Sequence, residues 1–324
     1  FKGYKMSSYK VVIDLGSSYI SAGFLGSSFI VKEPSIVALD SSLQEVKAVG
    51  SSAVKMFSES YSKVKIARPI LEGCIIDFDN GRTLVKYIIK KLLPHIRNFS
   101  KISVTCIVPC ATTSNDKKKI ETALLTLGLR QVAFIEAVLC SSYALFSESN
   151  VNKGIVADIG SDCADFAAVY NGNIIAGCTL YYAGKQLTEA ILGLVKSKYG
   201  IVLDFEEAEK LKLACASLYY NDTSTCVVSG ISITSGLTEE VELSAKELYN
   251  TVTDFCRKYF QVIESLILSV PDEASNLIKQ SGVFLCGGGA RLTGLDSFIA
   301  DNTKLEVMIG RDPQNSAING AILG

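Results

Sequence analysis

The segment "VVIDLGSS" combines an acid, a glycine and two hydroxyl side chains in a pattern that could hold a phosphate group. Gly16 lets the backbone turn and bring its N–H groups close to phosphate oxygens. Ser17 and Ser18 add hydroxyl donors. Asp14 would repel a polyphosphate unless a divalent cation lay between them, so its position implies Mg²⁺ bound largely through water. Alone, such a segment is more often an ordinary Asp-Gly turn.

The later segment "VADIGSDCAD" repeats this plan with an apolar strand, Asp158, an apolar residue, Gly160 and Ser161, followed by a second strand. The repeat predicts two related halves, each with an Asp at a hairpin turn, and weakens the interpretation as an ordinary turn. We expect Asp14 and Asp158 to face one ligand across a cleft. Asp162 adds an acid where a phosphate-binding loop would usually carry glycine.

A glycine run and a single glutamate could complete such a site. "CGGGARLTG" follows a predicted strand and precedes a helix, so Gly287, Gly288 and Gly289 could lie flat against a nucleotide, with the helix N-terminus toward an anion. "AFIEAV" places Glu136 at a strand end before a helix. A carboxylate there could polarise a water for attack on a phosphate, or could simply favour the helix dipole.

"FEEAEKLKLA" places Glu209 and Lys212 one turn apart on the same face of a predicted helix. The spacing fits a solvated salt bridge, and it also fits contacts to a ribose and an adenine. Only the position of this helix relative to the other segments separates the two interpretations.

Composition limits the chemistry further. A chain of 324 residues, 48% hydrophobic and 20% charged, is long enough for about two domains. Its formal net charge of −1 provides no basic field, so nucleic acid is not an expected partner. Because His95 is the single histidine, we do not expect a zinc site built from histidines or Ser-His-Asp catalysis. The 10 cysteines lie mostly singly in apolar runs, which predicts reduced thiols and a cytoplasmic location.

Strand-like runs alternate with helical patterns along the chain, which predicts α/β layers. We expect strands over residues 9–15 and 102–109, helices over 82–96 and 205–218, and a hairpin over 164–177. No apolar run reaches the ~18 residues of a membrane span.

Together with "KEPSIVAL" and "KIARPILEGCIIDFD", these segments resemble the actin-like ATPase superfamily. "ARPILEGCIIDFD" followed by "KYIIKKL", and "KYGIVLDFEEAEKLK", favour the bacterial MreB branch over FtsA, the chaperone ATPases and the sugar kinases. The match begins at about Lys10 and continues to the C-terminus. The resemblance implies an α/β, actin-like ATPase fold with two related lobes, or four subdomains, around a nucleotide cleft. It predicts lobe I at 9–145 plus 313–324 (small subdomain about 31–66) and lobe II at 146–312 (small subdomain about 182–245).

The family's site residues carry over by position. We expect Glu136 to position the hydrolytic water with Asp158 also acting in catalysis, and Asp14 with Asp158 to bind Mg²⁺. The residues expected to contact ATP or ADP are Gly16, Ser17, Ser18, Gly160, Ser161, Asp162, Glu209, Lys212, Gly287, Gly288 and Gly289.

The second phosphate loop departs from the family pattern of Asp, an apolar residue, three glycines, two threonines and Glu. This chain has Ser161, Asp162, Cys163 and Ala164 where the family has two glycines and two threonines. The Asp162 carboxylate would lie near the β- and γ-phosphates. Like charges about 4 Å apart cost roughly 1 kcal/mol in water and about 4 kcal/mol at an effective dielectric of 20. After Glu136, "AVLCSS" replaces the family's usual Glu-Pro-Met-Ala-Ala.

The predicted function is that of a cytoskeletal protein that binds Mg-ATP and polymerises into filaments for bacterial cell shape, with slow or impaired hydrolysis. Two alternatives stay open: a degenerate paralogue that does not hydrolyse ATP, and a monomeric ATPase or kinase of the same superfamily. The expected partner is a second copy of the chain. A membrane surface, reached through Phe99, and cell-wall-synthesis or membrane-anchoring proteins are weaker candidates.

Overall fold

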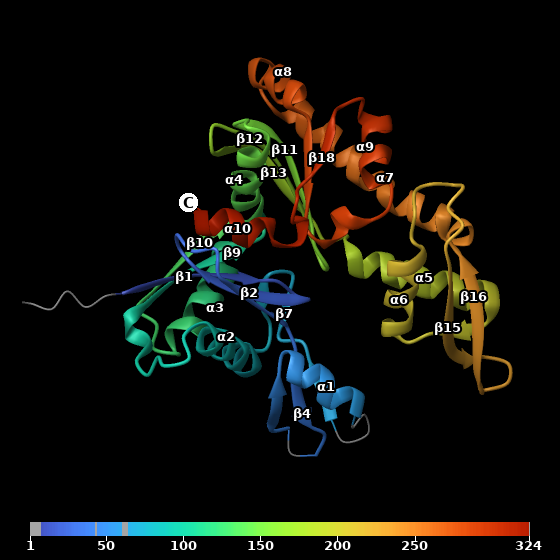
Figure 1. Cartoon of the computed structure of the whole chain (residues 1–324), viewed down its shortest axis with the longest axis horizontal. Helices are drawn as coiled ribbons and strands as arrows, with labels where there is room; N and C mark the ends of the chain where they lie inside the picture. Colours follow the sequence, from blue (N-terminus) through green and yellow to red (C-terminus); the bar gives the residue numbers. More distant parts are fainter. Residues whose placement is uncertain (1–7, 43, 60–63, 324) are drawn as a thin grey trace, which may run out of the picture. The chain divides into compact units, whose positions relative to one another are not determined.

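The computed structural model describes residues 8–42, 44–59 and 64–323 (Figure 1). The chain divides into two compact units. Unit 1 comprises the chain up to Asn150 together with Asn315–Gly324, and unit 2 comprises Val151–Gln314.

Unit 1 contains a five-stranded sheet in the order β10-β9-β1-β2-β3. Strands β1, β9 and β10 are parallel, and β2 and β3 continue the sheet in antiparallel fashion. The carboxyl ends of the three parallel strands therefore meet at one edge, where α/β proteins commonly bind ligands. The strands are β1 (Tyr9–Leu15), β2 (Tyr19–Phe24), β3 (Ile30–Pro34), β9 (Ile102–Val108) and β10 (Gln131–Glu136).

Alternate residues of β1 are buried on opposite faces of this sheet. Val11 and Ile13 belong to the core beneath α2 and α3, whereas Val12 packs with Ile318 on the side of α4 and α10. A Cβ at Gly320 would overlap the carbonyl of Cys140, so α10 and α4 meet backbone to backbone. The helices are α2 (Phe78–Leu92), α3 (Ser114–Leu125), α4 (Ala137–Ser149) and α10 (Ser316–Leu323).

The helix predicted over residues 82–96 is shifted toward the N-terminus in the structure. It begins at Phe78 because the side chain of Asp77 accepts a hydrogen bond from the Asn80 N–H at 3.1 Å and so caps the first turn. It ends at Leu92, because the proline at position 94 disfavours helical geometry in the residue before it.

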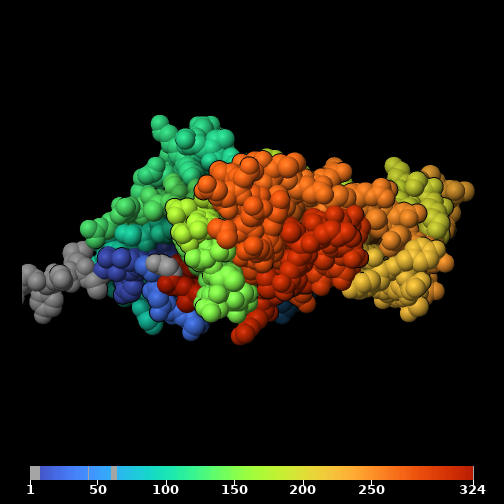
Figure 2. Space-filling model, turned by 90° about the horizontal axis from the view of Figure 1, so that it is seen from above, coloured from blue at the N-terminus to red at the C-terminus, as the bar shows by residue number. Residues whose placement is uncertain are grey.

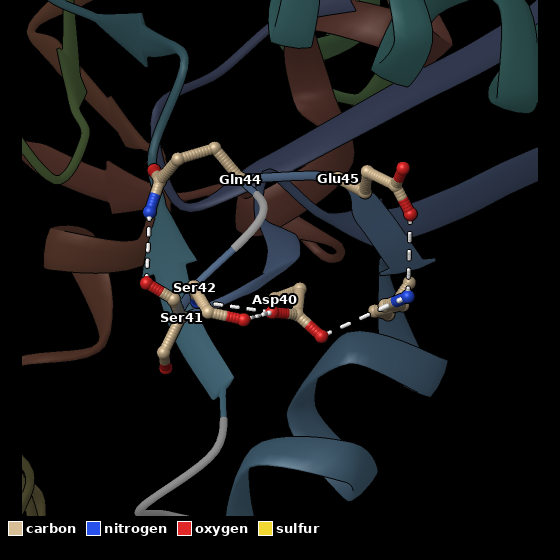
Figure 3. Close-up of polar contacts among 6 residues, drawn as sticks. Asp40, Ser41, Ser42, Gln44 and Glu45 are labelled. Atoms are coloured by element: carbon tan, nitrogen blue, oxygen red, sulfur yellow. Dashed lines mark hydrogen bonds and ion pairs between the residues drawn. The ribbon is translucent and has the colours of Figure 1, made fainter.

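A smaller sheet of unit 1, in the order β5-β4-β6, is packed against helix α1. In the turn between β4 and β5, Asp40 Oδ1 accepts hydrogen bonds from the N–H and hydroxyl of Ser42, and the Gln44 amide donates to the Ser41 carbonyl (Figure 3). The elements are β4 (Val37–Asp40), β5 (Val46–Val49), α1 (Ser51–Glu59), β6 (Val64–Ala67), β7 (Ile70–Leu71) and β8 (Cys74–Ile75).

A buried carboxylate joins this small sheet to the large one. Glu33 on β3 is 1% exposed and accepts hydrogen bonds from the N–H and the hydroxyl of Ser51, each at 2.7 Å. Its other oxygen pairs with Lys91 of α2. A buried charge is tolerated when it is paired and hydrogen-bonded, so Glu33 ties β3, α1 and α2 into one body.

Unit 2 contains a second five-stranded sheet, in the order β13-β12-β11-β17-β18. The predicted hairpin over 164–177 is confirmed as β12 and β13, joined at Asn171 and Gly172, which both have positive φ as a type I′ turn requires. The strands are β11 (Lys153–Ile159), β12 (Ala164–Tyr170), β13 (Asn173–Leu180), β17 (Val283–Cys286) and β18 (Val307–Ile309).

Phe166 on β12 packs against Tyr259 of the long helix α7, with ring centroids 5.8 Å apart. The helices α7 to α9 form much of the orange and red surface of unit 2 in Figure 2. A three-stranded sheet, β14-β15-β16, lies with α5 and α6 in the same unit. These elements are α5 (Gly184–Tyr199), β14 (Ile201–Val202), α6 (Phe205–Cys215), β15 (Thr225–Ser232), β16 (Thr238–Ser244), α7 (Ala245–Ser269), α8 (Asp272–Ser281) and α9 (Leu295–Thr303).

The chain returns from unit 2 to unit 1 through the short 3₁₀ turn η3 (Pro313–Asn315). On the unit 2 side, the Pro313 carbonyl accepts a hydrogen bond from the Gly287 N–H at 2.7 Å. On the unit 1 side, the Asn315 side chain accepts one from Lys32 of β3 at 2.8 Å. Both ends of the return segment are therefore fixed to the body of their own unit.

Phe99, the residue considered for membrane contact, lies in the 3₁₀ turn η1 (Phe99–Lys101). Its ring is partly buried and packs against the core of unit 1. Its surroundings therefore match an ordinary packing role. Across the part of the chain that the structure describes, no helix is both long enough and apolar enough to span a bilayer.

Candidate functional site

The first candidate phosphate loop is the turn between β1 and β2. Gly16 must lack a side chain, because a Cβ there would overlap the carbonyl oxygen of Tyr19. The hydroxyl of the fully buried Ser35 donates to the Gly16 carbonyl at 2.6 Å, and the Ser35 N–H donates to the Ser18 carbonyl at 2.9 Å. Ser17 accepts a hydrogen bond from the Glu72 N–H at 3.1 Å, which leaves its hydroxyl hydrogen to donate.

Within unit 1, the sheet brings Asp14 and Glu136 to the same edge. Asp14 is paired with Ile107 of β9, and Glu136 is paired with Val108 of that strand on its other side. One strand separates the two acids, which corresponds to about 10 Å across the sheet. Both side chains are partly exposed.

The second candidate phosphate loop is the turn between β11 and β12 in unit 2. The Gly160 N–H donates to the Cys163 carbonyl at 2.9 Å, and a Cβ on Gly160 would lie 2.9 Å from that oxygen. Asp158 stands opposite Asp165 in the antiparallel ladder. The first hairpin pairs Asp14 with the residue seven positions later in the same way. The structure thus confirms that the repeated segments form hairpins of one register.

The acids that depart from the family pattern are buried. Asp162 is 6% exposed and Asp165 is 3% exposed, and the Thr179 hydroxyl donates a hydrogen bond to Asp165. Burial, and then the charge of Asp165, raise the pKa of the neighbouring Cys178 thiol. The turn therefore carries more buried negative charge than a glycine-rich phosphate loop would.

The start of helix α5 supports this second loop. The Lys185 N–H donates to the Ser161 carbonyl at 2.8 Å, and the Gly184 N–H donates to the Gly160 carbonyl at 3.3 Å. A Cβ on Gly184 would approach that same carbonyl to 3.3 Å. The N-terminal N–H groups of α5 thus hold the carbonyls of the turn.

Helix α6 contributes the predicted Glu209 and Lys212 pair to the same region of unit 2. The Lys212 ammonium, 13% exposed, donates to Glu209 at 2.6 Å, to the Gly184 carbonyl at 3.0 Å and to the Thr188 hydroxyl at 3.0 Å. Three acceptors match the three hydrogens of an ammonium group. Lys212 therefore supports the start of α5, and its contact with a nucleoside stays a prediction.

The glycine run lies against the second loop, as the parallel pairing of β11 and β17 requires. A Cβ on Gly287, at φ +77°, would overlap the Ile159 carbonyl and lie 2.6 Å from Asp158 Oδ1. A Cβ on Gly289 would overlap the Ile159 side chain. The expectation that the segment from Cys286 to Gly294 lies between a strand and a helix is confirmed, since β17 ends at Cys286 and α9 follows Gly294; an anion facing the helix stays a prediction. Gly288 begins the 3₁₀ turn η2 (Gly288–Arg291), and α9 starts only at Leu295.

The segment after α6 is attached to the segment after this glycine run. Ser217 forms a parallel bridge with Thr293, and the Leu218 N–H donates to the Thr293 carbonyl at 2.9 Å. The Tyr219 ring packs against Gly294, where a Cβ would lie 3.2 Å from a ring carbon. The two elements expected to contact a nucleoside are therefore held together within unit 2.

Glu136 ends β10 and occupies the position that precedes helix α4. Its side chain makes no capping hydrogen bond to that helix. Its carboxylate instead forms an ion pair with Lys117 of α3 at 3.4 Å, and each side chain is 32% exposed. The structure therefore shows no capping hydrogen bond that would support a role of Glu136 at the start of α4.

The structure groups the predicted residues into two sets, one in each unit. Sequence reasoning missed the supporting residues Ser35, Lys117 and Thr188. Ser35 lies in the family-like "KEPSIVAL" segment, whereas no local pattern marks the other two. Among the described residues, no group of three or more His, Cys, Asp or Glu side chains could hold a metal ion by itself. Unit 1 holds Asp14, Gly16, Ser17, Ser18 and Glu136, and unit 2 holds Asp158, Gly160, Ser161, Asp162, Glu209, Lys212 and Gly287 to Gly289.

The sequence and the fold match known proteins over nearly the whole chain. A family model described as MreB/Mbl protein matches residues 8–323. The chain is 28% identical over 314 residues to the cell shape-determining protein Mbl of Bacillus subtilis (strain 168), which covers 95% of this chain and 93% of Mbl.

Two solved structures share the fold. Spiroplasma citri MreB 5 bound to AMPPNP matches with a TM-score of 0.89 and 24% identity over 97% of this chain and 95% of that one. A MamK double helical filament matches with a TM-score of 0.77 and 18% identity over 97% of this chain and 98% of that one. The predicted actin-like α/β fold and the family resemblance are both confirmed.

Proposed function

The chain belongs to the MreB/Mbl family, and from that premise we propose that it is an actin-like cytoskeletal protein that binds Mg-ATP and assembles into filaments. The observation that carries this proposal is the shared register of the two hairpins. Asp14 and Asp158 stand at corresponding ladder positions, each two residues before a turn glycine where a Cβ would meet a backbone carbonyl oxygen. Such turns suit close approach to phosphate oxygens.

The proposed ligand is ATP, which hydrolysis converts to bound ADP and released phosphate. Support comes from the AMPPNP described for the similar MreB 5 structure, since AMPPNP is an ATP analogue. We place the phosphates on the turns that begin at Gly16 and Gly160, and the nucleoside between α6 and the turn at Gly287.

Mg²⁺ fits the donors that the two hairpins offer. Mg²⁺ is commonly bound through one or two carboxylates, water and substrate phosphates rather than by an all-protein cage. Asp14 and Asp158 are both partly exposed at strand ends and supply carboxylates of that kind. When bound, the ion would neutralise phosphate charge near these acids.

Hydrolysis is assigned to Glu136. Its carboxylate would accept a hydrogen bond from a water aligned with the γ-phosphorus and orient the water lone pair for attack. The partial exposure of Glu136 at the sheet edge leaves room for this water. We expect the reaction to be slow, because Asp162 adds a negative charge to the second loop.

A second candidate function is a paralogue that binds nucleotide without hydrolysing it. The observation that favours it is the loss of the family's glycines and threonines, with the buried Asp162 and the half-buried Cys163 in their place. This candidate keeps the binding surfaces of both units and removes only the chemical step.

Filament formation is proposed from family membership and from the likeness to a protein described as a double helical filament. The biological task we propose is bacterial cell-shape determination, as in the named relative. Contacts with a membrane surface or with cell-wall proteins belong to the same proposal, although the packing of Phe99 gives them no support.

The proposal is tested by sedimenting the pure full chain with ADP, with Mg-ATP and without nucleotide, alongside phosphate release. Mg-ATP should move the chain into the pellet, and phosphate should follow slowly. A chain that stays in the supernatant under every nucleotide condition would contradict the filament proposal. Assembly without phosphate release above background would favour the non-hydrolysing paralogue.

A further inference from the structure

The ion pair between Lys117 and Glu136 is a specific contact in a lysine-rich stretch. Lys117, Lys118 and Lys119 follow one another at the start of α3. Lys118 and Lys119 are exposed, and Lys119 pairs with Asp116 on the same helix at 3.1 Å. Lys117 alone of the three is half-buried and reaches a residue of another element, Glu136 at 3.4 Å.

The helix face explains why Lys117 reaches the sheet edge. Ile120 and Leu124 are fully buried in the core of unit 1, and Lys117 lies three and seven residues before them, on the same face of α3. On β10, Phe134 packs against that core, and Glu136 follows it on the same side of the strand. The two side chains thus meet where a buried helix face reaches the end of a strand.

The pair leaves part of the glutamate available for chemistry. The single ion pair joins the Lys117 ammonium to Glu136 Oε1. Within the described residues, no other side chain or backbone group forms a hydrogen bond to the Glu136 carboxylate. Both side chains are about one-third exposed, so water can reach the second oxygen, Oε2.

We propose that Lys117 is a positioning residue that holds Glu136 Oε1, so that Oε2 is directed at the water that attacks ATP. This inference rests on the proposed function. In the reaction, the water oxygen bonds to the γ-phosphorus, the bond from that phosphorus to the bridging oxygen breaks, and ADP leaves with the electron pair. The water proton passes to Glu136 and then to the released phosphate. Lys117 takes no proton and touches no reacting atom.

Orientation of this kind affects turnover more than binding. A glutamate side chain has three rotatable torsions, and holding one oxygen removes alternatives that would point the other away from the water. ATP binding would not depend on this contact, because the turns at Gly16 and Gly160 bind the phosphates. Loss of Lys117 should therefore lower kcat and leave KM nearly unchanged.

The experiment measures phosphate release from full-length protein at varied Mg-ATP for Lys117→Gln, Lys117→Arg and Lys118→Gln. Lys117→Gln should lower kcat about tenfold with an unchanged KM. Lys117→Arg keeps the charge and the donor, so it should recover kcat to within about threefold of the unaltered protein. Lys118→Gln removes the same charge from the next, exposed residue and should have no effect.

Two further variants separate this inference from the proposed function. Glu136→Gln should abolish most hydrolysis while sparing ATP binding, and Lys117→Gln added to Glu136→Gln should cause no further loss. Unchanged hydrolysis in Glu136→Gln would refute the role of Glu136 itself. Normal or faster turnover in Lys117→Gln, with Glu136→Gln inactive, would overturn the positioning role alone. Equal losses in Lys117→Gln and Lys118→Gln would show a general charge effect and also overturn it. Melting temperatures of all variants establish that each is folded.

Discussion

Gly16 and Gly160 occupy the same position in two hairpins, because each directly follows the last paired residue of its first strand. At each glycine, a Cβ would be excluded by the backbone carbonyl three residues later, that of Tyr19 or Cys163. In both hairpins the last paired residues are five apart, Leu15 with Ile20 and Ile159 with Ala164. The equivalence is one of backbone geometry as well as of sequence. It implies that both turns respond alike to an added side chain.

A methyl group at Gly16 should therefore damage the first loop. Gly16→Ala places a Cβ on the Tyr19 carbonyl, which is backbone and cannot rotate away. We expect a loss of about 1–3 kcal/mol in the free energy of unfolding and at least a tenfold loss of ATP affinity. Denaturant unfolding and ATP titration would measure both. Gly193→Ala is the control, because that exposed helical glycine has open space around it and should be stabilised by the change. Equal effects at the two positions would contradict the steric argument.

Removing the charge of Asp162 should tighten ATP binding. The carboxylate is buried in the second loop, where we propose that phosphates bind. A like-charge cost of about 1 kcal/mol or more corresponds to at least a fivefold change in Kd. Asp162→Asn keeps the size and removes the charge, and Asp162→Gly also restores backbone freedom. Titration of each with Mg-ATP would separate the two effects, and a weaker affinity in Asp162→Asn would show that the charge is not unfavourable there.

Loss of the Lys212 ammonium should loosen the start of α5. Lys212→Met keeps the apolar stem but leaves Glu209, Thr188 and the Gly184 carbonyl without a shared donor. We expect about 1–3 kcal/mol of destabilisation and weaker ATP binding, because α5 holds the second loop. Lys196→Met, on an exposed face of α5, is the control. If nucleotide affinity were unchanged in a destabilised Lys212→Met protein, α5 would not support the loop as we infer.

Glu247 predicts an acid-sensitive contribution to stability. Hydrogen bonds from Lys198 and Tyr199, and then from the Ser244 backbone at the start of α7, lower the pKa of Glu247 from 4.5 to about 2. A carboxyl whose folded pKa is depressed stabilises the fold above its unfolded pKa, and this contribution is lost as the pH falls toward the folded pKa. Glu247→Gln should therefore cost about 1–2 kcal/mol near pH 7 and progressively less between about pH 4.5 and 2. Urea unfolding across that range measures the difference, and a cost that did not vary with pH would assign it to packing.

The sequence allowed the hairpins to be predicted but not their supports. Alternation and an Asp-Gly spacing are local patterns, so Asp14 and Asp158 could be matched from the order of residues alone. Lys117 is brought to Glu136 by the packing of α3 on the sheet, which no local pattern encodes. The order of strand, glycine turn and helix around Cys286 was predicted from local residue types, whereas the 3₁₀ turn η2 inside this segment was not. Helix α2 ends at Leu92, although apolar residues continue at the helical spacing beyond it. The proline at position 94 accounts for this earlier end.

The return from unit 2 to unit 1 has one residue between two hydrogen-bonded positions. Pro313 is hydrogen-bonded to Gly287 of the glycine turn and Asn315 to Lys32 of β3, so Gln314 alone lies between two fixed points. One residue spans only about 3.3–3.6 Å and cannot take up a large displacement. The backbone between these two hydrogen bonds therefore has few torsions that are free to change.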